Sequence, residues 1–166
     1  MIIRINNYDE GIHFITLKKK VYELDLDKPF AGNVEVNCKM DRSLSQIVLD
    51  CNLSVDAVLT CDRCTEEFER TLLNKFQLTY IFSRNIDDVD DDNVHYIHPE
   101  TDRIDISKDV REFCILSVPM KILCSNSCKG LCPHCGTNLN VEQCSCEDSL
   151  INPIWEPLLK LKNKLN

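Results

Sequence analysis

One stretch, residues 47–61, constrains the fold of this chain more than any other. Apolar side chains occupy every odd position in it: Ile47, Leu49, Cys51, Leu53, Val55, Ala57, Leu59 and Cys61. Most of the even positions are polar, and a period of two is typical of a β-strand with one buried face. Residues 34–40 alternate in the same way. The pattern predicts an antiparallel sheet, and we expect a strand this long to bend, bulge or break.

The alternation stops at Cys61-Asp62-Arg63-Cys64 and resumes from Phe68. This C-x-x-C therefore lies at a turn between two strands, whereas a redox C-x-x-C begins a helix. Three interpretations stay open for Cys61 and Cys64. They form half of a metal site, they line a structural turn, or, with the least support, they catalyse a thiol reaction.

Shorter elements flank these strands. Residues 12–17 and 20–26 are edge strands or loops, and residues 103–106 form a brief strand. We expect Ser107 to cap a helix that ends before Pro119. A second short helix is expected over residues 151–161. Cys38, Cys51 and Cys114 fall on apolar faces, so they are interpreted as small core residues.

These elements predict an α+β fold: an antiparallel β-sheet, with closure into a barrel as one option, one or two helices and a zinc-binding C-terminal tail. Residues 1–120 would form the sheet core with its helix. Residues 121–166 would form the cysteine-rich tail and the short C-terminal helix.

The tail is defined by its cysteines. Six of the eleven cysteines in the chain lie between Cys124 and Cys146. Four thiolates satisfy a zinc ion tetrahedrally, and Cys132-Pro133-His134-Cys135-Gly136 has the form of a zinc knuckle. Disulfides or free thiols are the alternatives. We expect about one structural zinc per chain, with a second if Cys61 and Cys64 pair with Cys124 and Cys128.

Composition restricts the cellular setting and the partners. A polar N-terminus and the lack of long apolar runs exclude a signal peptide and a membrane helix, so we expect a cytoplasmic protein without membrane contact. The net charge of −8 argues against bulk neutralisation of nucleic acid. Contact with RNA or a partner would use a local patch, such as Lys18–Lys20 or Lys160, Lys162 and Lys164. The alternative is that these lysines are ordinary solvent-exposed residues without a binding role.

Motifs for catalysis are missing from the sequence. The four glycines are scattered, so there is no phosphate-cradling loop, and none of the four histidines adjoins an obvious nucleophile. A cluster this rich in thiolate is typically closed, whereas a catalytic zinc keeps one open position. We therefore predict a protein that is not an enzyme.

Several of these motifs, in the same order, resemble the bacterial YceD family, also called domain-of-unknown-function family 177. The resemblance covers roughly residues 30–166. It rests on Cys61-x-Arg63-Cys64, Leu116-x-x-Pro119, the run from Cys128 to Asn140 that reads C-K-G-L-C-P-x-C-G-x-N-L-N, and Cys144-x-Cys146. The resemblance implies a factor that supports synthesis, processing or stability of large-subunit (23S) ribosomal RNA. Its partner would be that RNA or a ribosomal protein.

The resemblance also implies a ligand set. Some relatives carry His-x-His where this chain has Cys144 and Cys146, an exchange that metal ligands tolerate. The first choice is therefore Cys132, Cys135, Cys144 and Cys146, with Cys124 and Cys128 as alternates and Cys61 and Cys64 ranked below them. Arg63 and the three C-terminal lysines are candidate contacts to RNA or a partner. The common Asp-Pro-Arg of relatives is Asn152-Pro153-Ile154 here, which puts an arginine contact there in doubt.

Two other functions remain as alternatives. One is a thiol or zinc-dependent enzyme that uses Cys61 and Cys64. The other is a metal-ordered adaptor unrelated to ribosomes. The sequence does not determine the oligomeric state.

Overall fold

The computed structural model describes residues 1–84 and 93–146. Its strands are β1 (Ile2–Arg4), β2 (Gly11–Lys20), β3 (Phe30–Arg42), β4 (Gln46–Thr60), β5 (Glu67–Phe82), β6 (Val94–Ile97) and β7 (Arg103–Asp105). Two 3-10 turns, η1 (Ile5–Asn7) and η2 (Val21–Leu24), flank β2, and the helix α1 (Ser107–Leu116) follows β7. The second expected helix, at residues 151–161, lies outside the described residues.

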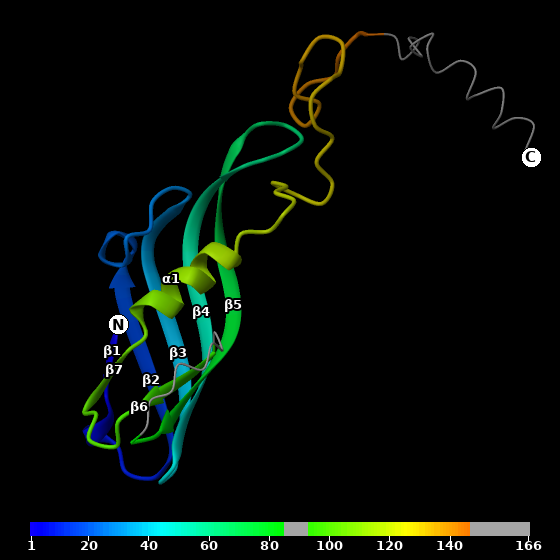
Figure 1. The fold of residues 1–166 in the computed structure, drawn as a ribbon. Coiled ribbons are helices and arrows are strands. Elements are labelled where there is room, and N and C mark those ends of the chain that lie inside the picture. Colours follow the sequence, from blue (N-terminus) through cyan, green and yellow to red (C-terminus); the bar gives the residue numbers. More distant parts are fainter. Residues whose placement is uncertain (85–92, 147–166) are drawn as a thin grey trace, which may run out of the picture.

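A five-stranded sheet in the order β2-β3-β4-β5-β6 forms the body of the molecule (Figure 1). β2 to β5 pair antiparallel, as the alternation predicted, but β6 runs parallel to β5, so the sheet is mixed. Closure into a barrel is wrong, because β2 and β6 stand at opposite edges and do not pair.

The inner face of the sheet is covered by other elements. α1 packs on β4 and β5 (Figure 1), and the Phe113 ring stacks on Phe76 with 4.3 Å between centroids. β1 and β7 form a separate two-stranded sheet. Ile3 and Ile104 join the same core from these two strands. The apolar residues of β3, β4 and β5 are buried beneath this cover, which explains why one face of each strand is apolar.

The long alternating segment forms one strand that does not break. β4 keeps one continuous register with β5 over all fifteen of its residues, so of the expected bend, bulge or break, a break does not occur. The irregularity lies on β3 instead, where the register with β4 shifts between Ala31 and Val34. Gly32 lies within the bulge and has a φ of +70°, which a glycine adopts without strain.

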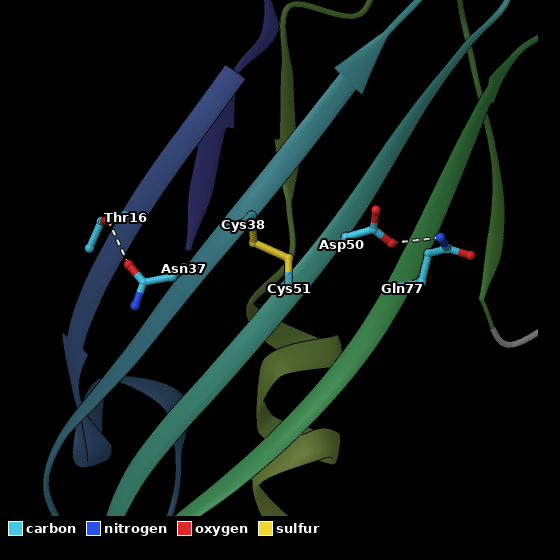
Figure 2. Close-up of a disulfide and its surroundings, with 6 residues drawn as sticks. All are labelled: Thr16, Asn37, Cys38, Asp50, Cys51 and Gln77. Atoms are coloured by element: carbon cyan, nitrogen blue, oxygen red, sulfur yellow. Dashed lines mark hydrogen bonds between the residues drawn. A yellow bond between two sulfur atoms is a disulfide. The ribbon is translucent and has the colours of Figure 1, made fainter. Parts of the chain in front are cut away.

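Cys38 and Cys51 lie directly opposite each other on β3 and β4. Both are buried in the core, as the alternation indicated. They are also joined by a disulfide, which the sequence interpretation did not include (Figure 2). On the flanking strand pairs, Thr16 bonds to Asn37 and Gln77 bonds to Asp50.

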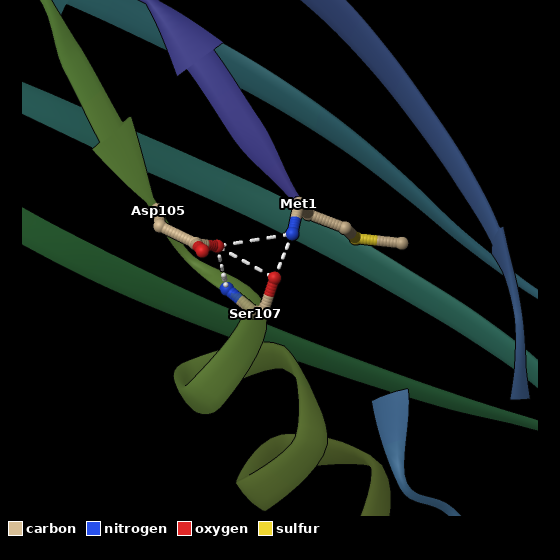
Figure 3. Close-up of polar contacts among 3 residues, drawn as sticks. All are labelled: Met1, Asp105 and Ser107. Atoms are coloured by element: carbon tan, nitrogen blue, oxygen red, sulfur yellow. Dashed lines mark hydrogen bonds and ion pairs between the residues drawn. The ribbon is translucent and has the colours of Figure 1, made fainter. Parts of the chain in front are cut away.

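The helix begins one residue earlier than predicted. Ser107 is its first residue rather than its cap, and Val110 and Cys114 face the core. The Ser107 hydroxyl and backbone N–H donate to Asp105 Oδ1 at 2.6 and 2.9 Å. The Met1 ammonium donates to the same oxygen at 3.0 Å and also to the Ser107 hydroxyl (Figure 3). This cluster connects β1 to the start of α1.

The cluster makes a prediction about pH. The hydrogen bonds from Ser107 lower the pKa of Asp105 from 3.8 to about 2. A lowered folded-state pKa adds stability above about pH 4, and this contribution disappears as the pH falls towards 2. Asp105→Asn should therefore destabilise the protein at pH 7 but have a shrinking effect between pH 4 and 2. The measurement is urea unfolding across this range.

Ser107→Ala provides the control for this experiment. It removes the hydroxyl donor while keeping the carboxylate, so it should reduce the same pH-dependent contribution. A difference between the native protein and Asp105→Asn that stays constant from pH 7 to pH 2 would contradict the prediction.

Among residues 1–84 and 93–146, there is no helix with the length and apolar character needed to cross a bilayer.

Candidate metal centres

The hairpin between β4 and β5 presents two cysteines at its tip. The Cys61 N–H bonds to the Glu66 carbonyl and the Thr65 N–H bonds back to the Cys61 carbonyl, both at 2.9 Å. Thr65 has a φ of +58°, which turns the chain sharply into β5. Cys61 and Cys64 are only 1% and 2% exposed, packed against Cys128, Leu123 and Cys124. The C-x-x-C thus lies at a strand-to-strand turn, as predicted.

The segment after α1 crosses over this tip. Asp62 donates its backbone N–H to the Ile122 carbonyl at 2.8 Å, and its carboxylate accepts the Ile122 N–H at 2.6 Å. Arg70 on β5 donates to the Leu123 carbonyl at 2.8 Å. These three bonds place Cys124, the next residue, beside Cys64, with 3.7 Å between the two sulfurs.

Arg63 holds the following turn. Its guanidinium donates to the Cys128 carbonyl at 2.8 Å, and its own carbonyl accepts the Leu131 N–H at 3.1 Å. Gly130 has a φ of +80°, and a Cβ on it would lie 3.0 Å from the Arg63 carbonyl oxygen. Glycine is needed here both for the backbone conformation and for the close approach. The Cys128 sulfur consequently lies 3.8 Å from that of Cys61.

Cys61, Cys64, Cys124 and Cys128 form what we call the hairpin cluster. All four sulfurs lie within 4.8 Å of one another. Zinc–sulfur bonds of about 2.3 Å in a tetrahedron place the sulfurs about 3.8 Å apart. The two distances above therefore fit four thiolates around one zinc ion.

Hydrogen bonds favour the thiolate at two members of the hairpin cluster, Cys61 and Cys128. At Cys64 a backbone hydrogen bond from Glu66 is instead outweighed by burial and the neighbouring sulfurs, which raise the pKa to about 12, and burial also raises the pKa of Cys124. Burial opposes ionisation of Cys61, but three backbone N–H groups, led by that of Cys124, outweigh it and lower the pKa of Cys61 to about 6. The side-chain amide of Asn140 donates to the Cys128 sulfur at 3.3 Å and lowers the pKa of Cys128. A metal ion binds the thiolate form, so these donors suit a metal site.

Cys132, Cys135, Cys144 and Cys146 form the tail cluster, whose sulfurs also lie within 4.8 Å of one another. The Cys132 N–H bonds to the Thr137 carbonyl at 2.8 Å and the Gly136 N–H to the Cys132 carbonyl at 2.9 Å. Gly136 has a φ of +74°, as the knuckle requires. The Thr137 hydroxyl lies 3.2 Å from the Cys135 sulfur and helps to lower the pKa of Cys135 to about 6.

The two clusters differ in exposure, and hydrogen bonds connect the tail cluster to the hairpin. Three members of the hairpin cluster are buried, whereas Cys135 and Cys146 of the tail cluster are exposed. Leu139 donates its N–H to the Gly130 carbonyl at 2.9 Å, and the Asn138 amide reaches Glu66 on the hairpin at 3.3 Å. The tail cluster is therefore anchored to the hairpin through the loop that carries Asn138.

The sequence-predicted residues are distributed between these clusters. The first-choice set comes together as the tail cluster, while the alternates Cys124 and Cys128 lie with Cys61 and Cys64. Arg63 has an exposed side chain although one of its N–H groups is used internally. Lys160, Lys162 and Lys164 lie outside the described residues.

Two supporting asparagines were not identified from the sequence. Asn140 bonds to the Cys128 sulfur, and its side-chain oxygen accepts the Lys129 N–H at 2.8 Å. Asn138 accepts from the Asn140 backbone at 3.0 Å and reaches the hairpin through Glu66. Both lie in the motif Asn138-Leu139-Asn140. The sequence signal that could have identified them is this pair of asparagines between the cysteines of the tail.

The structure is thus an open sheet with two four-cysteine clusters at one end, each of them a candidate metal site. The model of the family described as "Large ribosomal RNA subunit accumulation protein YceD" matches residues 49–162, so the chain belongs to that family. The match covers both clusters. No solved structure matches the chain.

Three relatives illustrate the family. A chloroplastic protein of Arabidopsis thaliana, named large ribosomal RNA subunit accumulation protein YCED homolog 1, is 26% identical over 166 residues. That alignment covers 84% of this chain and 51% of the relative, so this chain spans about half of that protein. The uncharacterized protein YlbN of Bacillus subtilis (strain 168) is 29% identical, covering 93% of this chain and 86% of YlbN. The Zea mays YCED homolog 1 is 43% identical over 63 residues, 36% of this chain and 21% of that protein.

Proposed function

We propose that this protein is a cytoplasmic, non-enzymatic factor that supports the synthesis, processing or stability of large-subunit ribosomal RNA by binding that RNA or a ribosomal protein. The observation that carries the proposal is the family match over residues 49–162. Two of the relatives above are named for the accumulation of large ribosomal RNA.

The two clusters support a structural role for zinc, one ion in each. Each cluster offers four thiol ligands, which leaves no position open for substrate or water. When bound, zinc would supply a rigid crosslink. In the hairpin cluster it would join the β4–β5 tip to the segment after α1, and in the tail cluster it would fix the knuckle. Residues 121–166 would then form a metal-ordered unit attached to the sheet core of residues 1–120.

The same geometry argues against the alternative of a thiol enzyme. A catalytic C-x-x-C needs an accessible nucleophile. Cys61 and Cys64 are buried, and their sulfurs face Cys128 and Cys124 rather than solvent. Ligation would occupy all four sulfurs.

The net charge of the protein affects how it could contact RNA or a ribosomal protein. The chain carries a net charge of −8, and each zinc with four thiolates carries about −2. Broad contact with phosphates is therefore disfavoured. A ribosomal protein or a local RNA contact fits better. The exposed side of Arg63, next to the hairpin cluster, is a candidate for such a contact.

Depletion of the protein in its host tests this proposal. We expect large-subunit RNA to fall relative to small-subunit RNA, and re-expression of the native chain to restore the ratio. The measurement is the ratio of the two mature RNAs, together with large-subunit precursors. An unchanged ratio would refute the proposed role. Purification of the bound partners would favour an unrelated adaptor if ribosomal components were missing.

A further inference from the structure

The strand β2 forms one edge of the five-stranded sheet (Figure 1). Its ten residues pair with β3 along their whole length, from Gly11 opposite Arg42 to Lys20 opposite Asn33. Among residues 1–84 and 93–146, the other side of β2 pairs with no strand. A ten-residue edge strand is longer than most strands of globular proteins and can template another strand.

The register shows which backbone groups face this edge. Cys38 and Cys51 are 4.1 Å apart at their Cα atoms, the spacing of an antiparallel pair without mutual hydrogen bonds. The N–H and C=O groups of Cys38 therefore point away from β4 and towards β2, where they bond to Ile15, the residue opposite. Ile15 and the other odd residues of β2 thus point their N–H and C=O groups towards β3. Since this direction alternates along a strand, the even residues of β2 point theirs outward, away from the sheet. In agreement, the Lys20 N–H bonds to the Glu23 side chain rather than to β3.

The even residues of β2 also carry its exposed apolar side chains. Phe14 is 82% exposed and Ile12 is 56% exposed, although both lie in regular strand. Large apolar side chains beside unpaired backbone groups are what a pairing strand buries.

The charges at the two ends of β2 are opposite. Asp9 and Glu10 precede the strand, and Lys18, Lys19 and Lys20 end it. In an antiparallel pairing of two copies with Phe14 opposite Phe14, the residue numbers in each pair add to the same value. Glu10 then faces Lys18 of the second copy, and Asp9 faces Lys19. A parallel pairing would instead place the lysines against lysines.

We propose that β2 is the interface of a symmetric dimer, in which two copies pair antiparallel through this edge around Phe14 and join their sheets into one. The proposal is independent of the role in ribosomal RNA. Lysines on an edge strand often protect it from association. Here they lie at one end only, with acids at the other, so they oppose most registers and favour this one.

A mixing experiment on the full chain tests the dimer. In Glu10→Lys, positions 10 and 18 are both lysine, and in Lys18→Glu both are glutamate, so each variant repels itself twice. Each should dimerise about tenfold more weakly than the native chain. An equimolar mixture should recover native affinity, because every contact across the heterodimer is then attractive. Recovery on mixing cannot arise from a folding defect.

The readout is sedimentation velocity over a range of protein concentrations. The native chain should pass from 19.2 kDa towards twice that mass. Phe14→Asp should remain a monomer. Leu73→Asp is the matched control, because Leu73 is 74% exposed on the same face of the sheet as Phe14 but on β5, and it should dimerise normally. A native chain that stays monomeric, a Phe14→Asp variant that dimerises like the native chain, or a mixture no tighter than its components would overturn the proposal.

Discussion

Replacing Cys64 by serine should remove about one zinc ion per chain and release the segment after α1 from the hairpin. A serine hydroxyl is a poor zinc ligand at neutral pH. Structural zinc contributes roughly 10–16 kcal/mol of apparent binding free energy in small zinc-dependent folds, so losing one of four ligands should affect folding of the whole tail. The measurements are elemental analysis of protein purified without added metal and limited proteolysis around residues 118–130.

Two variants serve as controls for this result. Cys114→Ser changes a cysteine that is buried on α1 outside both clusters, so it should keep both metal ions. Cys135→Ser should remove only the tail ion and leave the contacts between Asp62 and Ile122 protected. Zinc contents that are near zero in the native chain, or equal in the native and Cys64→Ser chains, would refute the metal assignment.

Replacing Leu53 by alanine should lower the free energy of unfolding by about 2–5 kcal/mol. Leu53 is 1% exposed near the middle of β4, the central strand of the sheet. Truncating it loses buried apolar contacts and leaves a cavity that the flanking strands cannot close. The measurement is urea unfolding with zinc present throughout.

Leu73→Ala is the control on the neighbouring strand. Leu73 lies opposite Ser54 on the open face and is 74% exposed, so its truncation should change the free energy of unfolding by about 0.5 kcal/mol or less. Equal effects of the two substitutions would mean that the covered and open faces of the sheet are assigned wrongly.

The strands were predictable because burial on one face leaves a local mark. Residues 47–61 carry the period of two that β4 shows, and the interruption at Cys61 marks the hairpin tip. The cover of the sheet was less predictable. Nothing local in Ile2–Arg4 or Arg103–Asp105 indicates that these two segments pair with each other across about a hundred residues. The open edges and the parallel β6 also depend on contacts that no single segment encodes.

Of the two cysteine clusters, one was predictable from local sequence and the other was not. The tail cluster comes from residues 132–146, a short segment whose spacing already indicated a metal knuckle. The hairpin cluster joins Cys61 and Cys64 to Cys124 and Cys128, some sixty residues away. Counting cysteines allowed this pairing as an option, but it did not show that the alternates belong to the hairpin.

The sequence by itself determined the long strands β3, β4 and β5, the turn at Cys61–Cys64, the family and the local shape of the knuckle, because each depends on periodicity or spacing along the chain. Only the tertiary structure decided that the sheet stays open, that Cys38 and Cys51 are bonded, and that the segment after α1 crosses the β4–β5 tip. These features arise from contacts between distant segments. The physical reason is that hydrogen bonds such as those between Asp62 and Ile122 form only when packing has already brought both segments together.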